Sequence, residues 1–198
     1  MFTGIVEEVG TVRRLQGDQG THRYQILATA AFVEGIRTGD SICVNGVCLT
    51  ACDVQGESFQ VDVSTETREC TTFGTSAREG HVNLERSVTP STRLGGHIVS
   101  GHVDGIGKLM AREDHESESV LWISIPEGLS RYIVPKGSVC VEGVSLTVNR
   151  VEKHRYCVTV IPHTLENTTL GRLRPGAEMN TEIDLVARYL ERLMQDRG

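Results

Sequence analysis

The chain has 198 residues, of which 38% are apolar and 23% are charged, a composition that indicates a folded protein and excludes a largely disordered one. Its 20 basic and 26 acidic residues give a net charge of −6, which argues against a nucleic-acid binder because such proteins neutralise phosphates with Lys and Arg. No apolar run approaches the roughly 20 residues of a membrane span, and the start of the chain carries Glu7 and Glu8 where an export signal is basic, so we expect a cytoplasmic protein with no membrane partner.

The first part of the chain is predicted to form short antiparallel β-strands, because Val, Ile and Thr are frequent and the runs end at Gly, Asn or Asp. The expected strands are Ile5–Val12, His22–Ala28, Ser41–Val44, Val47–Val54, Ser58–Ser64 and His81–Arg86. Asn45-Gly46 predicts a two-residue hairpin turn, and short helical turns are expected near Ala30–Gly35 and Glu66–Thr72. Six such strands favour a small closed barrel, which leaves no exposed sheet edge.

The second part of the chain repeats the first at an offset of 97 residues. Ser41–Thr50 falls on Ser138–Thr147, and the hairpin signal Asn45-Gly46 falls on Glu142-Gly143. Three other blocks align at the same offset without a gap, so we predict two homologous domains, 1–87 and 98–185, joined by Val88–Gly96. The fold class is therefore expected to be all-β, with two six-stranded antiparallel barrels.

The tail departs from the repeat and predicts an amphipathic helix. Its apolar residues recur at helical spacing, and Asp184 is a candidate N-cap. The apolar residues are Leu185, Val186, Tyr189, Leu190, Leu193 and Met194. The apolar stripe either packs back on its own barrel or packs against the same helix of other subunits; the near-heptad spacing favours the second alternative.

The six cysteines are expected to be reduced thiols in a protein that is not exported. No CxxC pair occurs among them, and the histidines show no HExxH pattern, so we expect no structural zinc site.

Positions that differ between the two copies are candidates for chemistry, because the backbone frame is shared while the reactive groups are not. Ile5 aligns with His102, Cys48 aligns with Ser145, and Gly39 aligns with Lys136. Histidine is suited to proton transfer near neutral pH. The alternatives remain open: Cys48 is equally a small buried apolar residue, His102 a structural histidine and Lys136 a surface lysine. His97, in the linker, has no predicted role.

The sequence resembles the riboflavin synthase family through motifs that span nearly the whole chain. The motifs are MFTGIVE at Met1–Glu7, VNGVCLT at Val44–Thr50, GGHIVSGHVDG at Gly95–Gly105, GVSLTV at Gly143–Val148 and TLENTTLG at Thr164–Gly171. The resemblance implies two Greek-key barrels and a C-terminal helix, 186–198, that joins three subunits into a homotrimer. It implies a site between the N-terminal barrel of one subunit and the C-terminal barrel of its neighbour, and association with lumazine synthase.

The reaction that the resemblance implies is a dismutation of two molecules of 6,7-dimethyl-8-ribityllumazine, without a cofactor or metal. One molecule donates a four-carbon unit to the other, which yields riboflavin and 5-amino-6-(ribitylamino)uracil. We hypothesise that His102, with Ser145 or Thr147, assists the loss of a proton from the C7 methyl group of one molecule. Cys48, or a water held by Cys48 and Ser41, is expected to add at C7 of the other.

The substrate contacts that the resemblance implies fall into two matching sets, one for each barrel. The backbone of Gly4–Val6 and Gly101–Val103 is expected to bond the pteridine edge, and threonine hydroxyls and acidic side chains are expected to bind the ring or the ribityl chain. The expected contacts are Gly4, Ile5, Val6, Cys48, Leu49, Thr50, Asp62, Val63, Ser64, Thr65, Glu66, Thr67, Gly101, His102, Val103, Lys136, Ser145, Leu146, Thr147, Ile161, Pro162, His163, Thr164, Leu165 and Glu166. Which barrel holds the donor stays open.

Two rival functions belong to other classes. A non-catalytic lumazine protein, an optical antenna of the same double-barrel fold, binds its chromophore without converting it, and it need not keep the residues at positions 48 and 102. A flavin-reductase-like barrel would need a nucleotide-binding partner domain, for which the chain has neither a GxGxxG motif nor the length.

Overall fold

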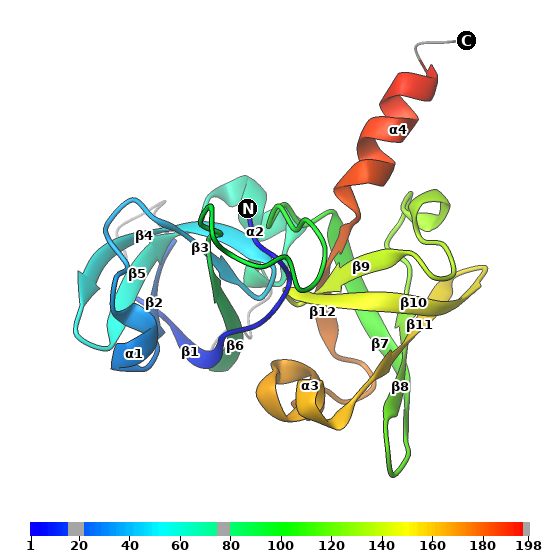
Figure 1. Cartoon of the computed structure of the whole chain (residues 1–198), viewed down its shortest axis with the longest axis horizontal. Coiled ribbons are helices and arrows are strands. Elements are labelled where there is room, and N and C mark those ends of the chain that lie inside the picture. The colour runs from blue at the N-terminus through cyan, green and yellow to red at the C-terminus, as the bar shows by residue number, and fades with distance from the viewer. Residues whose placement is uncertain (16–21, 75–79, 196–198) are drawn as a thin grey trace.

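The computed structural model describes residues 1–15, 22–74 and 80–195, which form two closed six-stranded β-barrels and a C-terminal helix (Figure 1). The strand order is β1-β2-β5-β4-β3-β6 in the first barrel and β10-β11-β8-β7-β12-β9 in the second, and all recorded strand pairs are antiparallel. The first barrel consists of β1 (Glu8–Arg14), β2 (Arg23–Leu27), β3 (Ser41–Val44), β4 (Val47–Gln55), β5 (Ser58–Asp62) and β6 (Gly80–Arg86). The second consists of β7 (Gly105–Asp114), β8 (Ser119–Ser124), β9 (Ser138–Val141), β10 (Val144–Glu152), β11 (Arg155–Val160) and β12 (Glu178–Ile183). The predicted all-β fold of two repeated barrels is confirmed.

Short helices connect the strands at equivalent places in the two barrels. The helices α1 (Ala30–Val33) and α2 (Thr65–Cys70) lie close to the predicted helical turns. In the second barrel α3 (Pro162–Asn167) is the counterpart of α2 at the offset of 97 residues. The 3-10 turns are η1 (Thr72–Gly74), η2 (Ser130–Tyr132) and η3 (Thr169–Arg172).

The hairpins β3–β4 and β9–β10 have the predicted two-residue turns. Asn45 and Gly46 have φ values of 48° and 82°, and Glu142 and Gly143 have 51° and 79°. Two successive positive φ values are those of a type I′ turn, whose twist matches that of the flanking strands. The turn fixes the register that pairs Cys43 with Cys48.

The first strand starts three residues later than predicted, at Glu8 in place of Ile5. The residues before it leave their own barrel and run along the second one; Phe2 forms a bridge with Val99, and Gly4 O accepts a 2.8 Å hydrogen bond from Ser145 N. The expectation of a strand from Ile5 was therefore wrong, because Val6 packs against the core of the second barrel, which is distant in sequence.

A symmetric set of buried hydrogen bonds joins the two barrels. The side-chain amide of Asn83 donates to Glu142 O at 2.8 Å, and that of Asn180 donates to Asn45 O at 2.8 Å. Each asparagine is 1–2% exposed, and its amide oxygen accepts from a backbone N–H of the opposite barrel. The reciprocal pairs define a pseudo-two-fold relation between the barrels.

The C-terminal helix α4 (Leu185–Gln195) projects away from both barrels (Figure 1). Asp184 Oδ1 accepts a 3.0 Å hydrogen bond from Val186 N, as expected of an N-cap. The apolar stripe is exposed rather than packed back on its own barrel: Val186, Tyr189, Leu190, Leu193 and Met194 are all more than half exposed. In the described part of the chain, no helix is long and apolar enough to span a membrane.

Candidate functional site

The candidate side chains on strands β4 and β10 lie on the outer face of each barrel. Along β4 the buried residues alternate with exposed or half-buried ones, so Leu49 points into the core while Cys48 and Thr50 point outward. Strand β10 has the same pattern, with Ser145 and Thr147 outward. The barrel interiors are filled by apolar side chains, so a ligand at these positions binds against the outside of the wall.

Each of these strands is covered by a segment that belongs to the other barrel. We call 1–6 and 98–103 the crossing segments. Gly101 O accepts a 2.8 Å hydrogen bond from Cys48 N, as Gly4 O does from Ser145 N. Both glycines have left-handed φ values, +75° at Gly4 and +79° at Gly101. A Cβ on Gly4 would lie 2.6 Å from Ser145 Cβ, and one on Gly101 would lie 2.6 Å from Cys48 Cβ. Only glycine permits this conformation and this approach without strain.

Because each crossing segment covers the other barrel, the predicted contacts fall into two groups, which we call the half-sites. In the first, Val103 packs against the N-terminal core cluster that contains Leu49 and Val63. In the second, Val6 packs, with Leu165, against the C-terminal cluster that contains Leu146. The first half-site therefore combines Gly101–Val103 with β4 and residues 62–67, and the second combines Gly4–Val6 with β10 and residues 161–166.

The reactive groups of the two half-sites differ. The first half-site contains Cys48 and His102, and Ser41 is the cross-strand partner of Thr50. The second contains Ser145 and Thr147, with Ile5 at the position that corresponds to His102. Within one chain, His102 thus shares a half-site with Cys48 rather than with Ser145.

His97, for which the sequence predicted no role, lies in the second half-site. Its Nδ1 is 2.7 Å from Ser145 Oγ, and the ring is 9% exposed with no hydrogen-bond partner at Nε2. Burial lowers the pKa of His97, which favours a neutral ring whose Nδ1 can accept a hydrogen bond from the Ser145 hydroxyl. The sequence signal that could have placed His97 here was the preceding Gly95-Gly96. Gly96 lies so close to the second half-site that a Cβ on it would lie 2.6 Å from Ser145 Cβ.

Several predicted ribityl contacts already have partners. Asp62 accepts two 2.7 Å hydrogen bonds from Arg23, whose hydrogen bonds lower the pKa of Asp62. Ser64 is the N-cap of α2, where its Oγ accepts from Thr67 N at 3.1 Å. The corresponding position of α3 is Ile161, which makes no side-chain cap, and Pro162 follows it. The two half-sites therefore differ in polarity at this end.

Lys136 has a left-handed backbone, with φ of 68°, where its repeat counterpart Gly39 has φ of 100°. A lysine here is strained where glycine is not. In both copies the backbone N–H of this residue bonds the strand that carries the outward-facing groups: Lys136 N donates to Val148 O at 2.7 Å.

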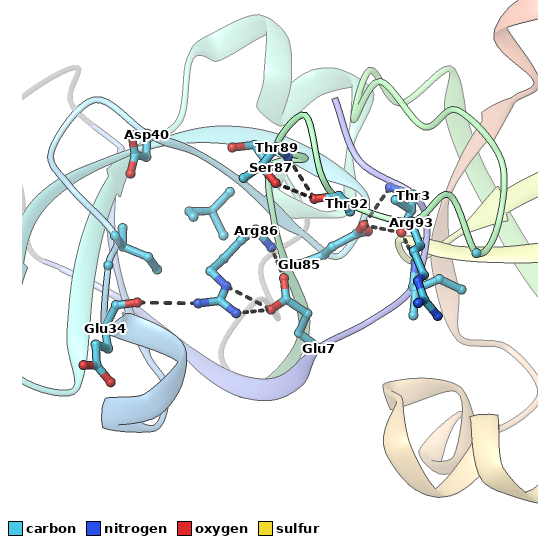
Figure 2. A pocket seen from close by; sticks show the side chains of 15 residues that line it. Thr3, Glu7, Glu34, Asp40, Glu85, Arg86, Ser87, Thr89, Thr92 and Arg93 are labelled. Carbon is cyan, nitrogen blue, oxygen red and sulfur yellow. Dashed lines mark hydrogen bonds and ion pairs between the residues drawn. The ribbon is translucent and has the colours of Figure 1, made fainter.

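A cavity of about 840 Å³ lies beside the first barrel and the linker (Figure 2). Of the predicted contacts it is lined only by Ile5. An ion pair between Glu7 and Arg86, 2.6 Å, spans it, and the carbonyl of Glu34 lies 3.5 Å from the same guanidinium (Figure 2). The residues that follow the cavity lining by 97 positions lie on the second barrel and on α4, so α4 projects from the equivalent surface of that barrel. Among the described residues no three His, Cys, Asp or Glu side chains are grouped to hold a metal ion.

The lumazine binding domain matches this chain twice, at residues 3–87 and 100–184. A riboflavin synthase of Mycobacterium bovis is 43% identical over 202 residues, which cover 100% of both chains. One from Photobacterium phosphoreum is 38% identical over 194 residues, 98% of this chain and 89% of the relative. The chain belongs to the riboflavin synthase family. It is an enzyme of this type, with one lumazine-binding domain in each repeat.

Solved structures have the same double-barrel fold as this family member. A crystal structure of LumP complexed with riboflavin superposes with a TM-score of 0.85 at 24% identity, covering 92% of this chain and 99% of that chain. LumP with 6,7-dimethyl-8-(1′-D-ribityl) lumazine gives a TM-score of 0.82 with the same coverage. At this identity the likeness concerns the fold.

Proposed function

We propose that the enzyme catalyses the dismutation of two molecules of 6,7-dimethyl-8-ribityllumazine to riboflavin and 5-amino-6-(ribitylamino)uracil. The four carbons lost by one molecule are gained by the other, so the reaction balances without an external oxidant or cofactor. The observation that carries the proposal is the pair of half-sites, which share one backbone frame but differ in their reactive groups. Like frames suit two identical substrates, and unlike side chains suit a donor and an acceptor.

A complete site is proposed between two subunits, the first half-site of one facing the second half-site of its neighbour. Two exposed apolar side chains of the second half-site support this arrangement, because a facing subunit would cover them. Ile5 is 49% exposed and Ile161 is 55% exposed. The exposed stripe of α4 supports a homotrimer that brings the half-sites together. Holding both substrates in one site lowers the entropic part of the barrier.

The proposed roles follow the half-sites. Backbone groups of the crossing segments bond the pteridine edges, while Thr50, Thr67, Thr147 and Thr164 offer hydroxyls and Glu66 and Lys136 offer charge. In the facing arrangement, His102 of one half-site meets Ser145 and Thr147 of the other, which is what their joint action on the C7 methyl proton requires. Cys48, or a water held by Cys48 and Ser41, adds at C7 of the second molecule. His97 accepts a hydrogen bond from the Ser145 hydroxyl and thereby orients it.

The test is incubation of the purified full-length protein with the lumazine, combined with sedimentation. The expected result is growth of flavin fluorescence with release of one pyrimidine per riboflavin, in a species heavier than a monomer. Stable lumazine binding without conversion would identify an optical antenna instead. Full activity in a monomer would overturn the site between subunits.

The proposed location is the cytoplasm, and the six free thiols support a reducing compartment. From the family resemblance we also propose association with lumazine synthase, the enzyme that supplies this substrate. Co-sedimentation of the two proteins, with serum albumin as a control, tests this association.

A further inference from the structure

Two buried carboxylates occupy equivalent positions on the last strand of each barrel. Glu85 on β6 is 4% exposed, and Glu182 on β12 is 3% exposed. Their hydrogen bonds come from backbone N–H groups rather than from a basic side chain. Glu85 accepts from Thr3 N at 2.6 Å and Gly4 N at 3.0 Å, and also from the Thr3 hydroxyl.

Glu182 makes the equivalent contacts with the second crossing segment. Its Oε1 accepts from Ser100 N at 2.7 Å, and its Oε2 accepts from Gly101 N at 2.9 Å. Gly101 in turn accepts from Cys48 N through its carbonyl. A continuous chain of hydrogen bonds thus runs from the carboxylate, through the crossing segment, to the strand that carries Cys48.

We propose that Glu182 and Glu85 are positioning residues, which hold the two crossing segments in the geometry that the reaction needs. Glu182 fixes the segment that carries His102, and Glu85 fixes the segment that carries Ile5. This inference rests on the proposed function, since it assigns the supports of the same half-sites. Neither carboxylate lies among the substrate contacts predicted from the sequence.

The arrangement requires the charged form of the carboxylate. Each oxygen of Glu182 accepts from a different N–H, so a protonated carboxyl group would direct its O–H at one of these donors and lose that bond. Burial raises the pKa of Glu182 to about 7. One of the two bonds to the crossing segment is therefore lost as the pH falls through neutrality, while the carboxyl group stays buried.

Charged side chains and two thiols face Glu182. Asp104 raises the pKa of Glu182 and Arg188, on α4, lowers it, both to a smaller extent than burial. Cys43 on β3 and Cys140 on β9 also face the carboxylate, and burial raises the pKa of both thiols well above their usual value. Both thiols are thus neutral throughout the range in which Glu182 titrates.

The experiment compares kcat at about pH 8 in the wild type, Glu182→Gln and the matched variant Glu85→Gln. In Glu182→Gln, kcat should fall about tenfold to 100-fold, because the amide of glutamine presents only one acceptor oxygen to the two N–H groups of Ser100 and Gly101. Glu85→Gln should also lower kcat, through the other crossing segment. A Glu182→Gln variant that keeps the wild-type kcat overturns the proposal.

A second measurement separates this inference from the proposed function and needs no variant. The amide proton chemical shifts of Ser100 and Gly101 report their bonds to the carboxylate directly. In the wild type both shifts should titrate with a midpoint at about pH 7. Shifts that do not change with pH overturn the positioning role. A wild type that does not convert the lumazine overturns the proposed function instead, whatever the chemical shifts show.

Discussion

At the scale of single residues, the two half-sites each combine an imidazole with a nucleophilic side chain, but they obtain the imidazole from different places. In the first half-site it is His102, which follows the glycine that covers Cys48. In the second it is His97 of the linker, 2.7 Å from Ser145. The position of His102 is Ile5 in that half-site. The two half-sites therefore share a backbone frame but take their imidazole from different positions.

His102→Gln should slow lumazine turnover by about 100-fold or more while leaving lumazine binding nearly unchanged, because glutamine keeps polarity but cannot transfer a proton. Turnover is measured by flavin fluorescence and binding by equilibrium titration. His115→Gln, in the exposed turn between β7 and β8, is the control and should retain wild-type turnover. Undiminished turnover in His102→Gln would remove this residue from the mechanism.

The buried carboxylate of Glu182 should also make stability fall as pH rises. Its folded-state pKa of about 7 lies above the usual 4.5, so between these values the folded state binds more protons than the unfolded state. The stabilisation is complete below about pH 4.5 and is lost as the pH rises through about 7, at a cost of at most roughly 3 kcal/mol. Denaturant unfolding at about pH 5 and pH 8 should give a smaller pH effect in Glu182→Gln than in the wild type; equal effects would contradict this origin.

At the scale of elements, α4 is held by its polar face and exposes its apolar face. Arg188 pairs with Asp104 at 2.7 Å, while Glu191 pairs with Arg131 at 2.7 Å and accepts from the Tyr132 hydroxyl. These contacts fix the direction in which the helix leaves the second barrel. The apolar stripe consequently faces away from the second barrel and stays exposed.

Replacing Leu190 and Leu193 by Asp should weaken self-association, because both are more than half exposed on the apolar stripe and would place charge in a helix–helix contact. Sedimentation velocity across a dilution series is the measurement. The monomer fraction should increase, and turnover should fall with it. Lys153→Asp, in the exposed β10–β11 turn, is the charge-changing control; a double variant that sediments like this control would exclude the stripe as the contact.

The strands and helices could be predicted where local chemistry decides them. The sequence predicted β3 at its observed bounds because Asn45-Gly46 fixes the turn, and the helix of the tail followed from its spacing. The start of β1 was mispredicted because Phe2 pairs with Val99, a partner that no local pattern reveals. For the same reason the sequence could not assign His97: its partner Ser145 is 48 residues away.

At the scale of the whole molecule, the two barrels meet closely at their equivalent hairpin turns. A Cβ on Gly46 would lie 2.9 Å from Gly143 N, and one on Gly143 would lie 2.8 Å from Gly46 N. Both turns are also bonded to the opposite barrel by the side chains of Asn83 and Asn180. This junction fixes the hairpins β3–β4 and β9–β10 relative to each other, and their second strands carry Cys48 and Ser145.

Gly46→Ala should destabilise the protein more than Gly56→Ala. Both glycines have positive φ, so alanine is strained at either, at a cost of about 1 kcal/mol. Gly56 faces open space, whereas Gly46 faces the backbone of the other barrel, which adds about 1–3 kcal/mol of overpacking. Urea unfolding of both variants measures the difference. Equal losses would mean that the barrels can move apart without cost.

The grouping of the site residues was the part that the sequence could not predict. The paired positions, such as Cys48 with Ser145, were visible from the repeat alone. Their assignment to half-sites depends on which barrel each crossing segment covers, and the repeat is compatible with either choice. The bond from Cys48 N to Gly101 O decides it.

Because each crossing segment covers the other barrel, the half-sites form in a definite order during synthesis on the ribosome. When residue 86 has been added, all six strands of the first barrel exist, but the amide of Cys48 still lacks the carbonyl of Gly101. The carbonyl of Gly4 likewise lacks its partner, the amide of Ser145. Each half-site is thus completed by residues from the other half of the nascent chain: the first once Gly101–Val103 have been added, and the second only after β10.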